Sequence, residues 1–190
     1  MKLADHDPRR LDVAAFAARG DAMQGMWPLS ALGRLAEGVP AEADDLPRRD
    51  VAWQAQGELR PVKGGEPEVW LRLTASADVP QECQRCLAPV AVPVAVDRWL
   101  RFVRDEDLAA QLDADSEDDV LSLPRWLDLQ ELVEDELLLS LPLVPRHERC
   151  PQPLPMASGA GEAAEIEPEA EARANPFAAL AALKGRSRSS

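Results

Sequence analysis

Two short motifs contain every cysteine of the chain and one of its two histidines. Cys83 and Cys86 form a C-x-x-C pair, and His147 and Cys150 form an H-x-x-C pair much later in the sequence. Thiolate sulfur and imidazole nitrogen are preferred ligands of Zn²⁺, which takes four of them in tetrahedral geometry. Two intervening residues allow a single turn to present both groups of a pair. The motifs therefore predict a zinc site, on the condition that the fold brings the two pairs together.

The cysteines allow two other interpretations. A redox motif of the thioredoxin type normally precedes a helix in a βαβ unit, whereas residues 87–89 lead into a strand pattern. The redox interpretation is therefore disfavoured. A structural alternative stays open, in which Cys83 and Cys86 are small, half-buried residues of a turn and His147 is exposed.

Other catalytic motifs are missing from the sequence. It contains no G-x-S-x-G, no phosphate-binding G-x-x-x-x-G-K-[ST] and no G-x-G-x-x-G. Carboxylates are grouped at 113–119, where the pattern is typical of a solvated loop rather than of a pair tuned by burial. We therefore expect no enzyme, and an unrecognised hydrolase is kept as an alternative.

The elements that must position the two motifs begin with strands. Alternating apolar residues predict strands over 51–59, 69–74 and 90–102, and the glycine-containing segment 61–67 predicts a hairpin turn between the first two. Three such strands joined by short loops form an antiparallel meander. Pro93 cannot donate a ladder hydrogen bond, so that part of the third strand should be a sheet edge or a bulge.

Helices are predicted on both sides of these strands. Within residues 1–50, apolar residues recur at helical spacing in two groups, which are Leu11, Val13, Phe16 and Ala17, and then Met26, Leu29, Leu32 and Leu35. The clearest helix begins at Asp128, with Glu131 in capping-box position, and continues to Leu141 before Pro142 ends it. Residues 105–124 are acidic and poor in apolar groups, which favours a mobile loop.

The negative charge of the chain is concentrated in one stretch. The net charge is −13, and residues 105–139 alone hold one basic and 13 acidic groups, a net of −12. A phosphate backbone repels such a surface, so a basic protein is the better partner for it. The acidic side of the long helix, formed by Glu131, Glu134 and Asp135, is the predicted partner-binding surface. A solvated acidic surface that only aids solubility is the alternative.

Cellular location is suggested by what the first residues lack. Charged residues follow Met1 almost at once, without the apolar stretch of an export signal. No apolar run reaches the roughly 18 residues that a membrane-spanning helix needs. We therefore expect a cytoplasmic protein that does not bind membranes and keeps its thiols reduced.

The last 40 residues are expected to behave differently from the core. Residues 151–174 are rich in proline, alanine, glycine and glutamate, which predicts a disordered linker. Residues 175–185 predict a short amphipathic helix, with Phe177, Leu180 and Leu183 on its apolar side. A helix this short is unstable alone, so it should dock on its own domain or on a partner.

These patterns together predict an α+β fold. A small antiparallel sheet, either a meander or a partial barrel, would carry packed helices, the acidic loop and the C-terminal linker. Residues 51–150 would form the core, and residues 1–50 would pack on it as a helical and loop segment.

Three stretches resemble the YceD family, the large ribosomal RNA subunit accumulation proteins. They are residues 82–89, which contain both cysteines of the first motif, residues 128–145 with His147 and Cys150, and residues 175–184. The resemblance implies a bacterial, cytoplasmic protein that affects synthesis, processing or stability of 23S ribosomal RNA, and it implies no established enzymatic activity. Some branches of the family look richer in cysteine after the long helix than this chain is.

Combining the resemblance with the charge pattern leads to a functional hypothesis. The chain would be a non-enzymatic accessory factor that binds a ribosomal or ribosome-assembly protein as an adaptor and acts on ribosomal RNA indirectly. The alternative is direct RNA binding through a zinc-organised site together with four arginines, Arg72, Arg85, Arg98 and Arg101.

Overall fold

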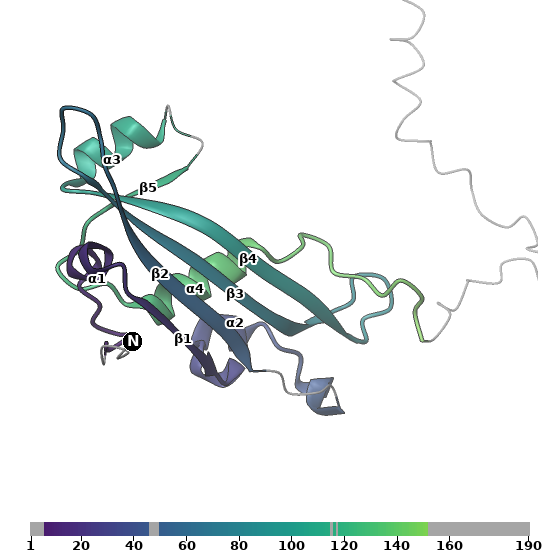
Figure 1. The fold of residues 1–190 in the computed structure, drawn as a ribbon. Helices are drawn as coiled ribbons and strands as arrows, with labels where there is room; N and C mark the ends of the chain where they lie inside the picture. Colours follow the sequence, from purple (N-terminus) through teal and green to yellow (C-terminus); the bar gives the residue numbers. More distant parts are fainter. Residues whose placement is uncertain (1–5, 46–49, 115, 117, 152–190) are drawn as a thin grey trace, which may run out of the picture. The chain divides into compact units, whose positions relative to one another are not determined.

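A five-stranded sheet forms the centre of the computed structural model, which describes residues 6–45, 50–114, 116 and 118–151 (Figure 1). These residues belong to the first of two compact units, Met1–Leu154. The strands follow the order β1-β2-β3-β4-β5. Their bounds are β1 Ala22–Trp27, β2 Val51–Arg60, β3 Glu68–Glu82, β4 Pro89–Val103 and β5 Asp119–Ser122.

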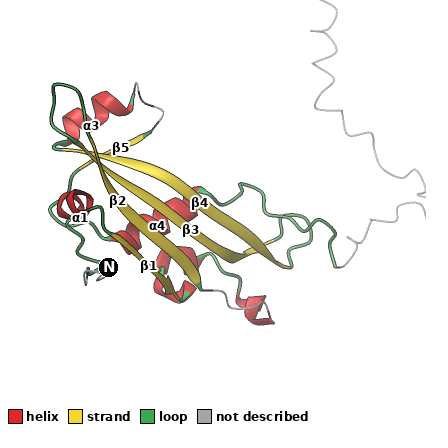
Figure 2. Cartoon of the chain, in the orientation of Figure 1, coloured by secondary structure: helices red, strands yellow, loops and turns green. Residues whose placement is uncertain are grey.

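The first four strands form an antiparallel meander, and β5 lies parallel to β4. Within the described residues, four α-helices accompany the sheet, α1 Val13–Arg19, α2 Gly33–Glu37, α3 Glu106–Asp113 and α4 Leu129–Leu139 (Figure 2). Two 3-10 helices, η1 Leu29–Ala31 and η2 Ala41–Asp45, lie between β1 and β2 in the chain. The predicted α+β class and the meander are confirmed, as an open sheet rather than a barrel.

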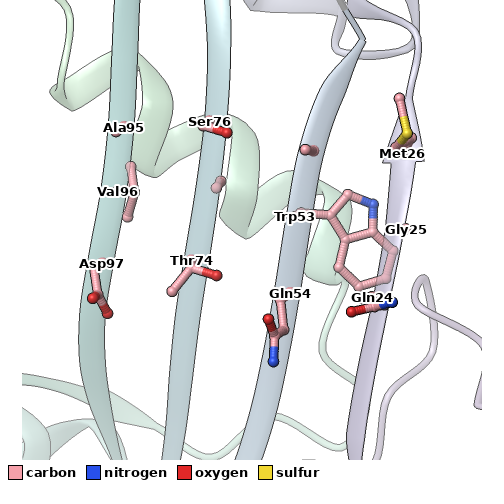
Figure 3. A pocket seen from close by; sticks show the side chains of 12 residues that line it. Gln24, Gly25, Met26, Trp53, Gln54, Thr74, Ser76, Ala95, Val96 and Asp97 are labelled. Atoms are coloured by element: carbon pink, nitrogen blue, oxygen red, sulfur yellow. The ribbon is translucent and has the colours of Figure 1, made fainter.

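One face of the sheet is buried and the other is open. Along β2, Val51, Trp53 and Ala55 are buried while Gln54 and Gln56 are exposed, as expected for a strand covered on one side. Helices α1 and α4 pack on the covered face, and α4 lies behind the sheet when the open face is viewed (Figure 3). The hydrophobic core is therefore a single layer between the sheet and these helices.

Helix α4 forms where the sequence predicted it. The Asp128 side chain accepts from the backbone N–H groups of Gln130 and Glu131, which satisfies two free donors at the helix start. Leu129, Val133 and Leu137 recur every four residues and are fully buried against the sheet. The helix ends at Leu139, two residues earlier than predicted.

The acidic segment after β4 is not a mobile loop, and that prediction is wrong. Asp105 caps α3 by accepting from the N–H of Leu108 at 2.9 Å. Strand β5 then pairs with Leu100–Val103 and buries Val120. The acidic side chains of α3 lie on its solvated side, so high charge did not prevent a capped helix and a short strand from forming.

The second predicted helical face in residues 1–50 is also wrong in part. Met26 belongs to strand β1, where it is 65% exposed, rather than to a helix with Leu32 and Leu35. Leu32 and Leu35 are buried as predicted, next to and within the short helix α2. The face predicted from Leu11 to Ala17 is confirmed for Val13, Phe16 and Ala17 of α1. Leu11 is buried too, but it lies before the helix in a bridge with Leu127.

Pro93 lies at a position where the missing N–H of a proline does not interrupt pairing with another strand. It lies opposite Asp78 of β3, and β5 covers β4 only over Leu100–Val103. Among the described residues, the other side of β4 at Pro93 has no strand partner, so the predicted edge is confirmed.

Within the described ranges, no helix combines the length and the apolar character needed to cross a membrane. Residues 152–190 lie outside the described residues, and with them nearly all of the predicted linker and the whole predicted helix with Phe177, Leu180 and Leu183. The predicted division into segments 1–50, 51–150, 151–174 and 175–185 stays a prediction.

Candidate metal centre

The turn between β3 and β4 carries the first pair of candidate ligands. The N–H of Cys83 donates to the carbonyl of Ala88 at 3.0 Å, and the N–H of Leu87 donates to the carbonyl of Cys83 at 2.8 Å. Leu87 adopts φ 60°, a left-handed conformation that is rare for leucine. This tight turn presents Cys83 and Cys86 together.

The segment after α4 brings the second pair to this turn. The N–H of Gln84 donates to the carbonyl of Pro145 at 2.9 Å, and Arg85 Nη2 donates to the carbonyl of His147 at 3.0 Å. Both bonds join the β3–β4 turn to a segment some 60 residues further along the chain. They place His147 and Cys150 beside the two cysteines of the turn.

The four side chains form one cluster, with one ligand atom from each residue and all four atoms within 4.8 Å of one another. The Sγ atoms of Cys83 and Cys150 are 4.0 Å apart, and Cys86 Sγ lies 3.5 Å from His147 Nδ1. Ordinary Zn–S and Zn–N bond lengths in a tetrahedron separate two sulfurs by about 3.8 Å and a sulfur from a nitrogen by about 3.6 Å. The donor set and its spacing therefore fit a tetrahedral metal ion.

The ring of His147 is held in the orientation that a metal ligand needs. Its Nε2 lies 3.1 Å from the carbonyl oxygen of Pro89. A carbonyl can only accept, so Nε2 carries the proton and donates. The lone pair of Nδ1 is then free to face the cluster, in the way that supporting hydrogen bonds orient metal-binding histidines.

Backbone amides favour the ionised form of Cys83. Burial raises the pKa of this thiol, but backbone N–H groups of His147, Arg85 and Cys86 donate to the sulfur and lower its pKa to about 5. Since the thiolate is the form that binds metal, the turn prepares this sulfur as a ligand.

The other two thiols show why a cation suits the cluster. The amide of Ala88 lowers the pKa of Cys86, but burial and the two neighbouring thiols raise it by more. Arg85 Nε donates to Cys150 Sγ over 3.0 Å, and this contact raises the pKa of the guanidinium. Three sulfur atoms so close together cannot all ionise at low cost without further positive charge. A divalent cation would supply that charge.

All four residues that the sequence singled out thus lie in one place. The contact of Arg85 with Cys150 was not predicted from the sequence, where Arg85 is a candidate phosphate contact only. Its position inside the C-x-x-C motif was the available signal, since a residue there must lie next to the ligands.

The acidic side of α4 is less open than predicted. Glu134 Oε1 accepts from the N–H of Leu35 at 3.0 Å, and Arg34 contacts both Glu134 and Asp135. These contacts with the carboxylates raise the pKa of Arg34. Of the three predicted partner-binding residues on α4, Glu131 is the exposed one. The role of this surface stays a prediction.

The four arginines of the RNA-binding alternative do not share one surface. Arg98 extends to the helix-covered face, where its Nε lies 3.1 Å from Glu136 of α4, and Arg85 lies at the cysteine–histidine cluster. All four already have anionic or thiol partners, Arg72 with Asp97, Arg98 with Asp119 and Glu136, Arg101 with Glu68, and Arg85 with Cys150.

A shallow hollow of about 840 Å³ lies on the open face of the sheet, across β1 to β4 (Figure 3). Small and amide side chains such as Gln54, Thr74 and Ala95 line it. Asp97 is the one ionisable residue among its lining residues, and it pairs with Arg72 at 2.9 Å, which lowers the pKa of the carboxyl group.

Comparisons with known proteins match most of the chain. The family model described as "Large ribosomal RNA subunit accumulation protein YceD" matches residues 71–184. A Haemophilus influenzae protein of the same description is 32% identical over 180 residues, which cover 93% of this chain and 95% of that protein. No solved structure gives a significant match.

Proposed function

The chain belongs to the YceD family of large ribosomal RNA subunit accumulation proteins, and on that premise we propose that it is a non-enzymatic adaptor for 23S ribosomal RNA accumulation. It acts in the cytoplasm and supports synthesis, processing or stability of this RNA. It does so by binding a basic ribosomal or ribosome-assembly protein, while zinc at the Cys83 cluster holds its own fold together.

One observation carries this proposal, the convergence of four protein ligands on a single point. A catalytic zinc site keeps one position open for water or substrate, whereas a structural site is closed by four protein ligands. Three cysteines and a histidine would fill all four positions. Zinc bound there would supply a cross-link between distant parts of the chain and no reactive water.

This cross-link supports an adaptor role through its position. Cys83 and Cys86 belong to the turn at one end of the sheet, while His147 and Cys150 precede the last forty residues of the chain. Zinc at this site would therefore anchor the chain at Cys150, which precedes the predicted docking helix 175–185 in the sequence. Phe177, Leu180 and Leu183 of that segment, together with Glu131 on α4, are the proposed partner contacts.

The distribution of charge favours a protein partner over RNA. The chain carries a net charge of −13, and phosphate affinity is normally supplied by unpaired basic groups. The arginines of the sheet are already paired with carboxylates. A phosphate would have to displace those partners in order to bind.

Direct RNA binding remains the second candidate because of two residues beside the metal centre. Arg146 and Arg149 are exposed, and no residue in the described part of the chain pairs with either. They flank His147, so a metal-organised segment could present them to a phosphate backbone.

Complementation would test the proposal. Haemophilus influenzae cells lacking their own YceD protein would receive the wild-type chain, Glu131→Lys, or Phe177→Asp with Leu180→Asp, and the ratio of 23S to 16S RNA would be measured. We expect the wild-type chain to restore the ratio, and both variants to fail although they fold and bind zinc. Full restoration by both variants would contradict the adaptor role.

Affinity capture from the same cells separates the two candidates. We expect the tagged chain to retain a basic protein after RNase treatment, and to lose it in the variants. Capture of RNA that depends on Arg146 and Arg149, and that weakens steeply with salt, would instead favour direct binding.

A further inference from the structure

Strand β1 ends the sheet on one side and leaves a row of backbone groups unpaired. The N–H of Gly57 donates to the carbonyl of Asp21, which fixes the phase of hydrogen bonding between β1 and β2. Hydrogen-bonded pairs alternate along an antiparallel ladder. Ala22, Gln24 and Met26 therefore direct their N–H and C=O groups away from β2, and no described residue pairs with them.

This edge lacks the protection that the opposite edge has. Proteins usually guard free edges with charged residues, prolines or bulges. The free part of β4 contains Pro89 and Pro93, whereas residues 22–27 contain no charged residue and no proline. Figure 3 shows Gln24 and Met26 beside the hollow, on the outermost strand at the right of the view. Met26 is 65% exposed.

We propose that β1 pairs with β1 of a second copy of this chain, antiparallel and about a twofold axis. The register that follows places Gln24 opposite Gln24 of the second copy, and Ala22 opposite Met26 of the second copy. Three residues from each copy would exchange both of their backbone bonds, which satisfies every outward group of the strand. The pairing ends there, because Pro28 has no N–H to donate to the next position.

The absence of charged residues along β1 allows a second copy to be the occupant in spite of the negative charge of both chains. Two chains of net charge −13 repel each other over most of their surfaces, so they can approach most easily where an edge carries no charge. Asp21, the carboxylate that directly precedes β1 in the sequence, is already paired with Arg19 at 2.7 Å and with His6 at 2.9 Å. The edge is therefore the surface where self-association meets little electrostatic opposition.

The dimer would extend the open face rather than cover it. Met26, Ala52, Ser76 and Ala95 lie side by side across four strands and line the hollow. Joining two sheets at β1 makes one continuous ten-stranded sheet, with a hollow on each side of the twofold axis. This inference is independent of the proposed function.

Sedimentation equilibrium of the full-length protein over a concentration series tests the dimer. We expect the wild-type chain to show a reversible monomer–dimer equilibrium. Gln24→Lys should shift it to monomer, because the register places two lysines opposite each other. Gln54→Lys is the matched control, since Gln54 is the neighbour of Gln24 on the same face but lies on an inner strand. It should dimerise like the wild type.

Cross-linking tests the register itself. Under mild oxidation Gln24→Cys should form a disulfide-linked dimer that reductant dissolves, because opposite residues of an antiparallel pair lie within disulfide range. Met26→Cys should not link to itself, since its opposite residue is Ala22. A wild-type chain that is monomeric at every concentration would overturn the proposal, as would a dimer that Gln24→Lys leaves intact or a Met26→Cys variant that links as fast as Gln24→Cys.

Discussion

The Sγ atoms of Cys83 and Cys150 lie 4.0 Å apart, although 67 residues separate them in the sequence. One sulfur belongs to the turn between two strands and the other to the segment after the last helix. Neither segment has a regular hydrogen-bond ladder with the other, so individual contacts at the cluster hold them together. A shared metal ion would add strong bonds between the β3–β4 turn and the segment after α4.

Replacing His147 separates a metal-binding role from a packing role. His147→Cys keeps four ligands and should retain zinc, because a Cys₄ site is also a stable structural site. His147→Ala removes one ligand and should weaken zinc affinity by more than the roughly 10–100-fold typical of losing a supporting hydrogen bond. Competition with a chromogenic chelator measures both. His6→Ala, which alters the other histidine, should leave the affinity unchanged, and equal affinity in His147→Ala would contradict the assignment.

Leu87 carries backbone strain that glycine would relieve. It has φ 60° and is 68% exposed, so its side chain gains little from packing in the isolated chain. Leu87→Gly should raise the free energy of unfolding of the zinc-loaded protein by about 1 kcal/mol. Leu87→Val should lower it, because a branched side chain fits this conformation poorly. Urea unfolding measures both changes, and a clear loss of stability in the glycine variant would show that the leucine side chain packs.

Gly57 allows helix α1 to touch the sheet. A Cβ atom there would lie 2.7 Å from Ala17 Cα and 2.7 Å from Phe16 Cδ1, and the first of these belongs to the backbone. Gly57→Ala should therefore destabilise the fold by about 1–3 kcal/mol. Gly33→Ala is the matched control, because no heavy atom lies within 4 Å of its Cβ position. Thermal unfolding of the two variants should differ in midpoint, and equal midpoints would refute the close approach.

Glu136 should make stability depend on pH in a defined direction. Burial raises the pKa of this carboxyl group, although Arg98 with its Nε at 3.1 Å opposes the rise. The folded state then holds the proton more tightly than the unfolded state, whose pKa is near 4.5. The contribution of this group to stability is therefore present at low pH and is lost as pH rises through the folded-state pKa.

The neutral variant Glu136→Gln removes this dependence. Relative to the wild type, it should have similar stability below about pH 4.5, where both side chains are neutral, and should become the more stable protein as pH rises toward neutrality. Denaturant midpoints of both proteins across this range give the comparison. A difference that stays constant with pH would mean that the carboxyl group titrates alike in both states.

The elements that depend mainly on their own short stretch of sequence were predicted correctly. Asp128 and the spacing of Leu129, Val133 and Leu137 specify a capped amphipathic helix without reference to the rest of the chain. The grouping of the three cysteines with His147 was also predictable, because these four residues are rare types in matched pairs. Their convergence depends on tertiary contacts such as the bond from Gln84 to Pro145, which no local pattern reveals.

The incorrect predictions, a helix that included Met26 and a mobile acidic loop after β4, arose where two sequence patterns pointed to different structures. Met26, Leu29, Leu32 and Leu35 happen to fit helical spacing, but β2 offers Met26 a ladder partner in Ala52. Strand pairing of this kind is decided by the neighbouring strand rather than by the segment's own pattern. The acidic residues around α3 favour disorder by composition, whereas in the structure Asp105 serves as the helix cap.

The most direct test of the account is elemental analysis of the purified, untagged full-length protein beside Cys83→Ser. A closed tetrahedral site predicts about one zinc per chain in the wild type and its loss in the variant, together with a lower unfolding temperature. Absence of metal from both proteins, with equal unfolding temperatures, would contradict the central claim and leave the four residues as ordinary packing positions.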